Sequence, residues 1–211
     1  MLVFIAQNTF ANNTSFNIEN LFALHDVSSY YFKPHQIITY MFLHGSFGHI
    51  FFNMFALWMF GAILENYWGA KRFLIFYMAC GIGSALLHLF ILHMQMKPII
   101  DSLSQYPLAE QQEALTNPNS VLNEATLGAS GAIFGCLAAF GYLFPNSLIY
   151  LYFFVPIKAK WFVLIYGAME LYLGIRNSAG DNVAHWAHLG GAIVGILFVL
   201  YWKKTDRRNF Y

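Results

Sequence analysis

The sequence has little charge and few cysteines. Charged residues make up only 10% of the 211 residues, whereas hydrophobic residues make up 58% and aromatic residues 19%. Soluble domains carry about 25% charged residues and leave much of their surface in water. The composition therefore excludes an ordinary cytosolic enzyme and a disordered chain, and it predicts a protein whose apolar surface lies in a lipid bilayer.

Metal-binding and nucleic-acid signals are also missing. The two cysteines, Cys80 and Cys136, lie inside apolar runs, and no Cys-x-x-Cys or Cys/His spacing accompanies them, which excludes a disulfide framework and a structural zinc site. A net charge of +1 gives no electrostatic reason to expect nucleic acid. Residues 1–6 lack the basic segment of a signal peptide. We expect no metal, no cofactor and no nucleic-acid partner.

Long apolar stretches are present instead. A membrane helix needs about 20 mostly apolar residues. Five stretches fit or approach this length, the fourth of them shorter and carrying Glu170: 46–64, 73–94, 125–144, 161–175 and 183–202. The first ten residues are too short to cross and resemble the second half of an incomplete first helix. We expect an all-α polytopic membrane protein.

Polar segments lie between and after these stretches. We expect one membrane domain over residues 1–211, with an external loop insertion at 95–124 and a basic tail at 203–211. The orientation of the chain in the membrane follows from the excess of Lys and Arg that cytoplasmic loops carry. If the turn between residues 64 and 73 is cytoplasmic, three basic residues lie outside (Lys33, Lys97 and Arg176) and eight lie inside: Lys71, Arg72, Lys158, Lys160, Lys203, Lys204, Arg207 and Arg208. We therefore expect a cytoplasmic C-terminus.

This topology brings polar residues from three helices to the outer leaflet. His49 and Asn53 share one helix face, because they are four residues apart. Ser130 is expected one turn into its helix, and His185 and His188 in the first two turns of the last helix. Small residues around Ser130 and after His188 allow two membrane helices to approach closely. A serine beside an imidazole is the minimum arrangement of an activated nucleophile.

Three segments resemble the signature motifs of the rhomboid intramembrane serine proteases: HGSFGHIFFN (44–53), GASGAIFG (128–135) and AHLGGAIVG (187–195). The segment GAILENYWGAKRF (61–73) resembles the family's turn after the second helix. The likeness covers nearly the whole chain after about residue 35. It implies a bundle of six transmembrane helices and a serine endopeptidase. Such an enzyme hydrolyses peptide bonds in or near the transmembrane segments of membrane-protein substrates.

The resemblance also implies roles for single residues. Ser130 would be the nucleophile and His188 the general base. The backbone N–H of Ser130 and the side chains of His49 and Asn53 would form the oxyanion hole. No acidic residue lies near His188 in the sequence except Asp181, so we expect a dyad without a carboxylate.

Other residues have supporting roles in this interpretation. Gly128 would shape the loop beside the oxyanion hole, and Phe134 would place an aromatic ring against the base. His44 would support the outer loop. We expect a local hydrogen bond or solvent contact for His185, with a supporting role as the alternative. Glu170 is expected in a buried hydrogen bond or at the interface.

Two other classes of protein stay open. Imidazoles on facing helices, from His49, His185 and His188, could bind a metal or a haem, although the His-Glu-x-x-His motif is absent and the GASG segment would have no role. The chain could also be an inactive rhomboid relative that binds membrane clients. We expect a multi-pass protein of a bacterial inner or cell membrane, with the active site toward the outer face. The sequence defines neither the substrate nor the oligomeric state.

Overall fold

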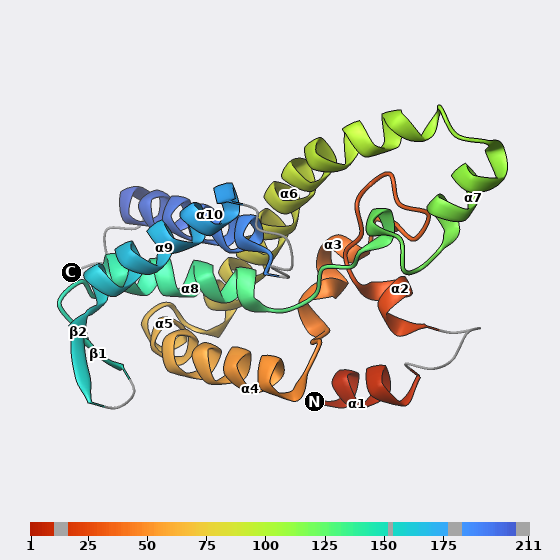
Figure 1. The fold of residues 1–211 in the computed structure, drawn as a ribbon. Coiled ribbons are helices and arrows are strands. Elements are labelled where there is room, and N and C mark those ends of the chain that lie inside the picture. The colour runs from red at the N-terminus through yellow and green to blue at the C-terminus, as the bar shows by residue number, and fades with distance from the viewer. Residues whose placement is uncertain (11–16, 152–153, 177–182, 206–211) are drawn as a thin grey trace.

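Helices dominate the structure (Figure 1). The computed structural model describes residues 1–10, 17–151, 154–176 and 183–205. Its elements are α1 (Leu2–Thr9), α2 (Ile18–Phe22), α3 (Gln36–Thr39), η1 (Tyr40–Phe42), α4 (Phe47–Ala56), η2 (Leu57–Gly61), α5 (Ala62–Trp68), α6 (Ala70–Leu103), α7 (Leu108–Thr116), η3 (Val121–Asn123), α8 (Ser130–Leu143), β1 (Leu148–Leu151), β2 (Val155–Lys158), α9 (Ala159–Arg176) and α10 (His185–Thr205). Helices α6, α8 and α10 pack against one another, and α9 packs against α8 and α10. This arrangement confirms the predicted all-α polytopic fold, to which β1 and β2 add one antiparallel hairpin.

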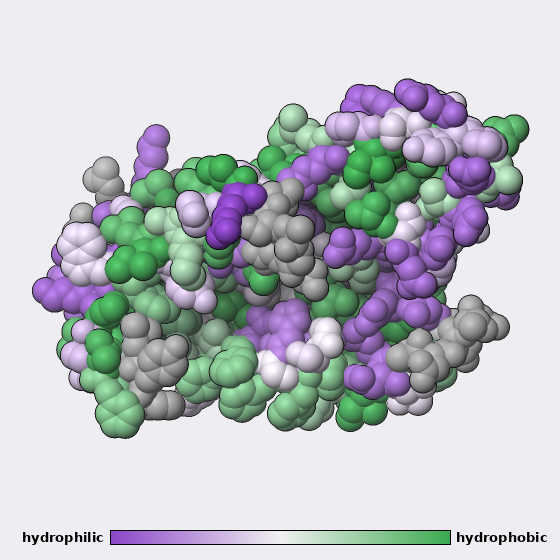
Figure 2. All heavy atoms as spheres, in the orientation of Figure 1, coloured by the Kyte–Doolittle hydropathy of each residue, from purple (hydrophilic) through white to green (hydrophobic). Residues whose placement is uncertain are grey.

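The helices have the length and the surface of membrane helices. Among the described residues, three continuous helices are long and apolar enough to cross a bilayer. They are Phe47–Trp68, which joins α4, η2 and α5, Ala70–Leu103, which is α6, and His185–Thr205, which is α10. Large apolar side chains point outward from them, such as Phe52, which is 69% exposed, and Trp58, which is 70% exposed. Figure 2 shows hydrophobic side chains over the bundle and hydrophilic ones gathered around the far end of α6 and α7. The protein is therefore an integral membrane protein.

The N-terminal ends of α4, α8 and α10 lie at one end of the bundle, and the hairpin lies at the other (Figure 1). Ser46 caps α4 by accepting a hydrogen bond from the His49 N–H at 3.1 Å, which satisfies one of the free amides of the first turn. Gly69, with φ +83°, ends α5 and turns the chain into α6. The helix faces that carry the candidate site residues therefore meet at one end, as the topology predicts.

Helix α8 begins later than expected. The predicted helix starts at residue 125, but Thr126 pairs with Leu24 through two backbone hydrogen bonds of 2.8 Å. Gly128 then takes φ +131°, a conformation that is incompatible with a regular helix. Ser130 is the first residue of α8, so the expectation that it lies one turn inside the helix is wrong. Helix α8 is 14 residues long, or about 21 Å, less than the roughly 30 Å of the hydrocarbon core.

Helix α6 extends further than the apolar stretch that predicted it. It continues beyond Met94 to Leu103, with Pro98 inside the helix. Lys97 and Asp101 form an ion pair of 3.0 Å on this extension, at the four-residue spacing that stabilises exposed helices. The segment 95–124 therefore begins as helix and includes α7. Its role as an external insertion stays a prediction.

Glycines set the distance between α8 and α10. A Cβ atom on Gly191 would overlap the carbonyl oxygen of Gly131, and one on Gly195 would lie 2.6 Å from the carbonyl oxygen of Gly135. Backbones that approach this closely gain van der Waals contact that larger residues would prevent. The two helices are thus held together along the segments that carry Ser130 and His188.

This packing yields the first prediction. Gly191→Val should force α8 and α10 apart and lower the free energy of unfolding by more than about 3 kcal/mol, the upper range for overpacked cores. Thermal unfolding and gel filtration in detergent would measure the effect. Gly167→Val on α9 is the matched control, because a Cβ there meets nothing within 4 Å. Equal stability of the two variants would contradict the packing argument.

Candidate active site

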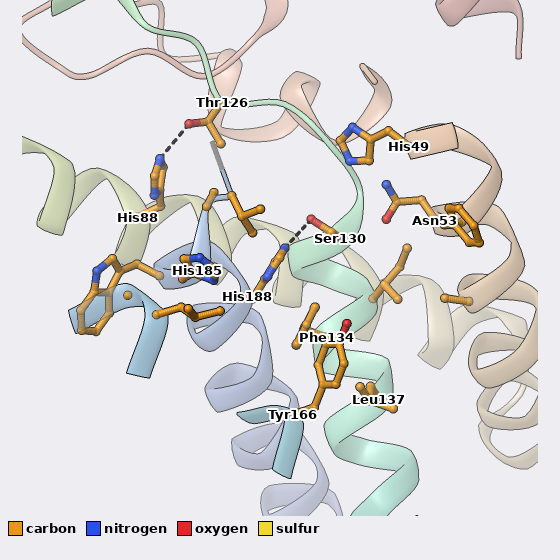
Figure 3. A pocket seen from close by; sticks show the side chains of 18 of the residues that line it. His49, Asn53, His88, Thr126, Ser130, Phe134, Leu137, Tyr166, His185 and His188 are labelled. Atoms are coloured by element: carbon orange, nitrogen blue, oxygen red, sulfur yellow. Dashed lines mark hydrogen bonds between the residues drawn. The ribbon is translucent and has the colours of Figure 1, made fainter. Parts of the chain in front are cut away.

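Ser130 and His188 meet across the contact between α8 and α10. The Oγ of Ser130 lies 2.8 Å from Nε2 of His188, as drawn in Figure 3. This distance is that of a hydrogen bond between hydroxyl and imidazole. His188 is 8% exposed, so its ring has little contact with solvent. The arrangement can transfer a proton from the serine to the imidazole.

The backbone N–H of Ser130 faces no helical partner. Ser130 opens α8, and the first four N–H groups of a helix have no carbonyl within the helix to bind. The preceding loop is fixed by the N–H of Gly128, which donates to the carbonyl of Tyr40 at 3.0 Å. The positive end of the helix dipole adds to this amide. The position suits a negatively charged oxygen.

His49 lies on the other side of Ser130 from His188 (Figure 3). Its Nδ1 accepts a hydrogen bond from the backbone N–H of Gly45 at 3.3 Å. A neutral imidazole whose Nδ1 accepts must carry its proton on Nε2. A Cβ built on Gly128 would lie 2.8 Å from that Nε2 and 3.8 Å from Ser130 Oγ. His49 is therefore a hydrogen-bond donor close to the hydroxyl, and Gly128 leaves the space between them.

A cavity of about 1430 Å³ connects these residues, and Asn53 lines it together with His49 and Ser130. Asn53 is only 7% exposed and lies on the same face of α4 as His49 (Figure 3). The ring of Phe134 stacks on that of His188, with centroids 4.1 Å apart and planes 6° apart. Phe134 therefore limits the orientations that the imidazole can take.

Glu170 brings an unexpected carboxylate to His188. Its Oε2 lies 2.9 Å from Nδ1 of His188 and 2.7 Å from Nδ1 of His185. The expectation that His188 has no carboxylate beside it is wrong. The expectation rested on the residues near His188 in the sequence, whereas Glu170 reaches the site from α9. The available signal was a single carboxylate inside an apolar helix, which is costly unless it is paired. Asp181 lies outside the described residues.

The three side chains of Glu170, His185 and His188 have the composition of a metal site. Ligand atoms around a tetrahedral zinc, at bonds of 2.0–2.1 Å, are separated by about 3.3 Å. The separations of 2.7 Å and 2.9 Å are shorter than that and match direct hydrogen bonds. A cation would have to part these groups. His49, the third ligand of the metal hypothesis, is not in this cluster.

Comparison with known proteins identifies the family. A profile described as the Rhomboid domain matches residues 31–204. The chain is 33% identical over 174 residues to Rhomboid protein 1, mitochondrial, of Saccharomyces cerevisiae, covering 82% of this chain and 43% of that protein. It is 30% identical over 179 residues to RHOMBOID-like protein 12, mitochondrial, of Arabidopsis thaliana, covering 84% and 48%. It is 30% identical over 165 residues to Rhomboid protease GluP of Bacillus subtilis, covering 76% and 24%.

This chain belongs to the rhomboid family. The match spans less than half the length of each of these three relatives. Two of the rhomboid relatives are mitochondrial and one is bacterial. They therefore support a membrane protein without selecting a bacterial membrane, and the bacterial inner membrane stays a prediction.

His44 lies beside His49, in the segment that precedes α4. Its ring meets the His49 ring edge-on, with centroids 5.1 Å apart, and it is 3% exposed. Its two ring nitrogens have no hydrogen-bond partner among the described residues. Burial, and then the nearby His49, lowers the pKa of His44 from 6.5 to about 4. The folded protein therefore holds this ring neutral.

The lowered pKa predicts a pH dependence of stability. The unfolded chain binds a proton at His44 near pH 6.5, whereas the folded chain does so only near pH 4. The contribution to the free energy of unfolding is complete above pH 6.5 and is lost as the pH falls from 6.5 to 4. His44→Gln should show a shallower loss of thermal stability over this range. Parallel curves for the two proteins would contradict the prediction.

Proposed function

We propose that this chain is an intramembrane serine endopeptidase. Ser130 is the nucleophile, His188 is the general base, and the substrates are transmembrane proteins cut in or near their membrane segments. The observation that carries the proposal is the 2.8 Å contact between Ser130 Oγ and His188 Nε2. The protease names of rhomboid relatives support it.

The reaction follows from the positions of these groups. Ser130 Oγ attacks the carbonyl carbon of the scissile bond while His188 Nε2 takes the hydroxyl proton. The carbonyl oxygen becomes an oxyanion. His188 then gives the proton to the leaving amine, and an ester to Ser130 is left. A water molecule then attacks this ester while His188 takes one of its protons, and that proton passes to Ser130 Oγ as the bond between Oγ and the acyl carbon breaks and the acid product leaves.

Three donors are available for the oxyanion in this proposal. They are the N–H of Ser130 at the start of α8, the Nε2–H of His49 and the side-chain amide of Asn53. Donors fixed in place before the reaction stabilise developing charge without reorganisation. Apolar residues of α4, α8 and α9 contribute to the lining of the cavity, which suits an unwound segment of a membrane helix that enters from the lipid.

The orientation in the membrane is part of the proposal. The excess of basic residues around the turn at Lys71 and Arg72 and at the end of α10, at Lys203 and Lys204, favours a cytoplasmic C-terminus. The site at the opposite end then faces the outer leaflet, where water can reach it. The last part of the basic tail, residues 206–211, lies outside the described residues. We propose that residues 1–211 form a single rhomboid domain.

The proposal predicts cleavage of a single-pass substrate in liposomes. Wild-type protein should cut it, whereas Ser130→Ala and His188→Ala should each reduce cleavage to background, because nucleophile and base act as one unit. Mass spectrometry of the products would measure cleavage and locate the bond. His93→Ala, in the second half of α6, is the histidine control and should cleave normally. A metal chelator should have no effect.

The outcomes separate the alternatives. Cleavage that survives Ser130→Ala would mean that another residue is the nucleophile. Loss of activity with a chelator would favour metal chemistry. A folded wild type that cuts none of several substrates would identify an inactive rhomboid relative.

The oxyanion hole predicts the effect of Gly128→Ala. The new methyl group would lie 2.8 Å from His49 Nε2 and displace that donor, so kcat should fall about 10²–10³-fold, the cost of losing one oxyanion donor. Gly69→Ala is the matched control, because Gly69 also has a positive φ of 83° but has nothing within 4 Å. Steady-state kinetics would contradict the prediction if both variants lost the same activity.

A further inference from the structure

Glu170 is the single acidic residue in α9, and it is 5% exposed. Its carboxylate contacts the candidate base, His188. We propose that Glu170 is a positioning residue that fixes the tautomer and the ring orientation of His188. The dyad thereby becomes a triad of serine, histidine and glutamate. This inference rests on the proposed function, because it assigns His188 the role of base.

The tautomer follows from the hydrogen bonds. An ionised carboxylate can only accept, so the 2.9 Å contact with Oε2 requires the proton of neutral His188 to be on Nδ1. Its Nε2 then carries a lone pair, and this is the atom that lies 2.8 Å from Ser130 Oγ. The opposite tautomer would present an N–H to the hydroxyl and could not take its proton. Glu170 therefore selects the form of His188 that acts as a base.

His185 keeps the carboxylate in place. Its Nδ1 lies 2.7 Å from the same Oε2, so two N–H donors meet on one oxygen. A buried carboxylate is costly unless hydrogen bonds compensate its charge, and the two imidazoles supply these bonds. The side-chain exposures of 6% for Glu170, 8% for His185 and 10% for His188 limit competition from water. The second histidine therefore holds the carboxylate that positions the first.

The charge that develops during the reaction gives Glu170 a second effect. When His188 takes the proton of Ser130 it becomes an imidazolium, and the carboxylate stabilises it, as in soluble triads. Among the described residues, His49 on α4 and His88 on α6 also interact electrostatically with His188. Both are imidazoles and bring no negative charge to the base. Glu170 is thus the compensating charge for the protonated base among the described residues.

The kinetic test compares Glu170→Gln, Glu170→Asp and the wild type, with Glu110→Gln in exposed α7 as the control for loss of an acidic residue. Glu170→Gln should lower kcat by about 10²–10⁴-fold, the range set by disrupted triads, while KM changes less than about threefold. Labelling of Ser130 by a fluorophosphonate should slow in parallel. Glu170→Asp should recover part of kcat. A Glu170→Gln enzyme with kcat within about threefold of wild type, or with only KM changed, would overturn the proposal.

A second measurement needs neither activity nor a variant of Glu170. Nitrogen-15 NMR of histidine-labelled wild type at neutral pH should show His188 with a protonated Nδ1 and a bare Nε2, assigned by the signal lost in His188→Gln. The Nε2-protonated tautomer would overturn the proposal even if the enzyme cleaves. The expected tautomer in a protein that cuts no substrate would instead overturn the proposed function and leave the role of Glu170 toward His188 intact.

Discussion

The close contact between α8 and α10 is the constraint on which the site depends. Gly191 meets the carbonyl of Gly131 with no room for a Cβ atom, and this approach lets a serine on one helix and an imidazole on the other lie 2.8 Å apart. Larger side chains in place of these glycines would move the two backbones apart and take Ser130 Oγ out of hydrogen-bond reach of His188 Nε2. In a bilayer the helices gain no hydrophobic free energy from this contact, so van der Waals packing has to supply the free energy of their association.

Within that frame, two histidines have opposite tautomers because their second nitrogens meet different partners. The Nδ1 of His49 faces the backbone N–H of Gly45 and must accept, which leaves a donor on Nε2. The Nδ1 of His188 faces the carboxylate of Glu170 and must donate, which leaves an acceptor on Nε2. In the proposed mechanism, the same type of side chain thus serves as an oxyanion donor on one side of Ser130 and as a base on the other. Hydrogen bonds away from the reacting atoms determine both roles.

Much of this arrangement could be predicted from the sequence, because the bilayer fixes helix directions and so the depth of each polar residue. The convergence of Ser130, His188, His49 and Asn53 required only the spans and their order. The partner of His188 could not be predicted in this way. Glu170 precedes it by 18 residues on another helix, and only the rotation of α9 about its axis decides whether the carboxylate faces the base or the lipid. An apolar sequence with a weak periodicity does not encode that rotation.

The start of α8 shows the same limit. An apolar pattern places residues 125–129 in a helix, but their backbone groups bind Leu24 and Tyr40 instead, contacts between segments about 90–100 residues apart that no local pattern contains. The consequence is chemical. A helix that begins inside the membrane leaves its first N–H groups without partners, and lipid cannot satisfy them. They must face protein, water or a ligand. Ser130, the first residue of α8, lines a cavity that His49 also lines. In the proposed mechanism, the unpaired N–H at the start of this short helix is therefore a donor to the developing negative charge.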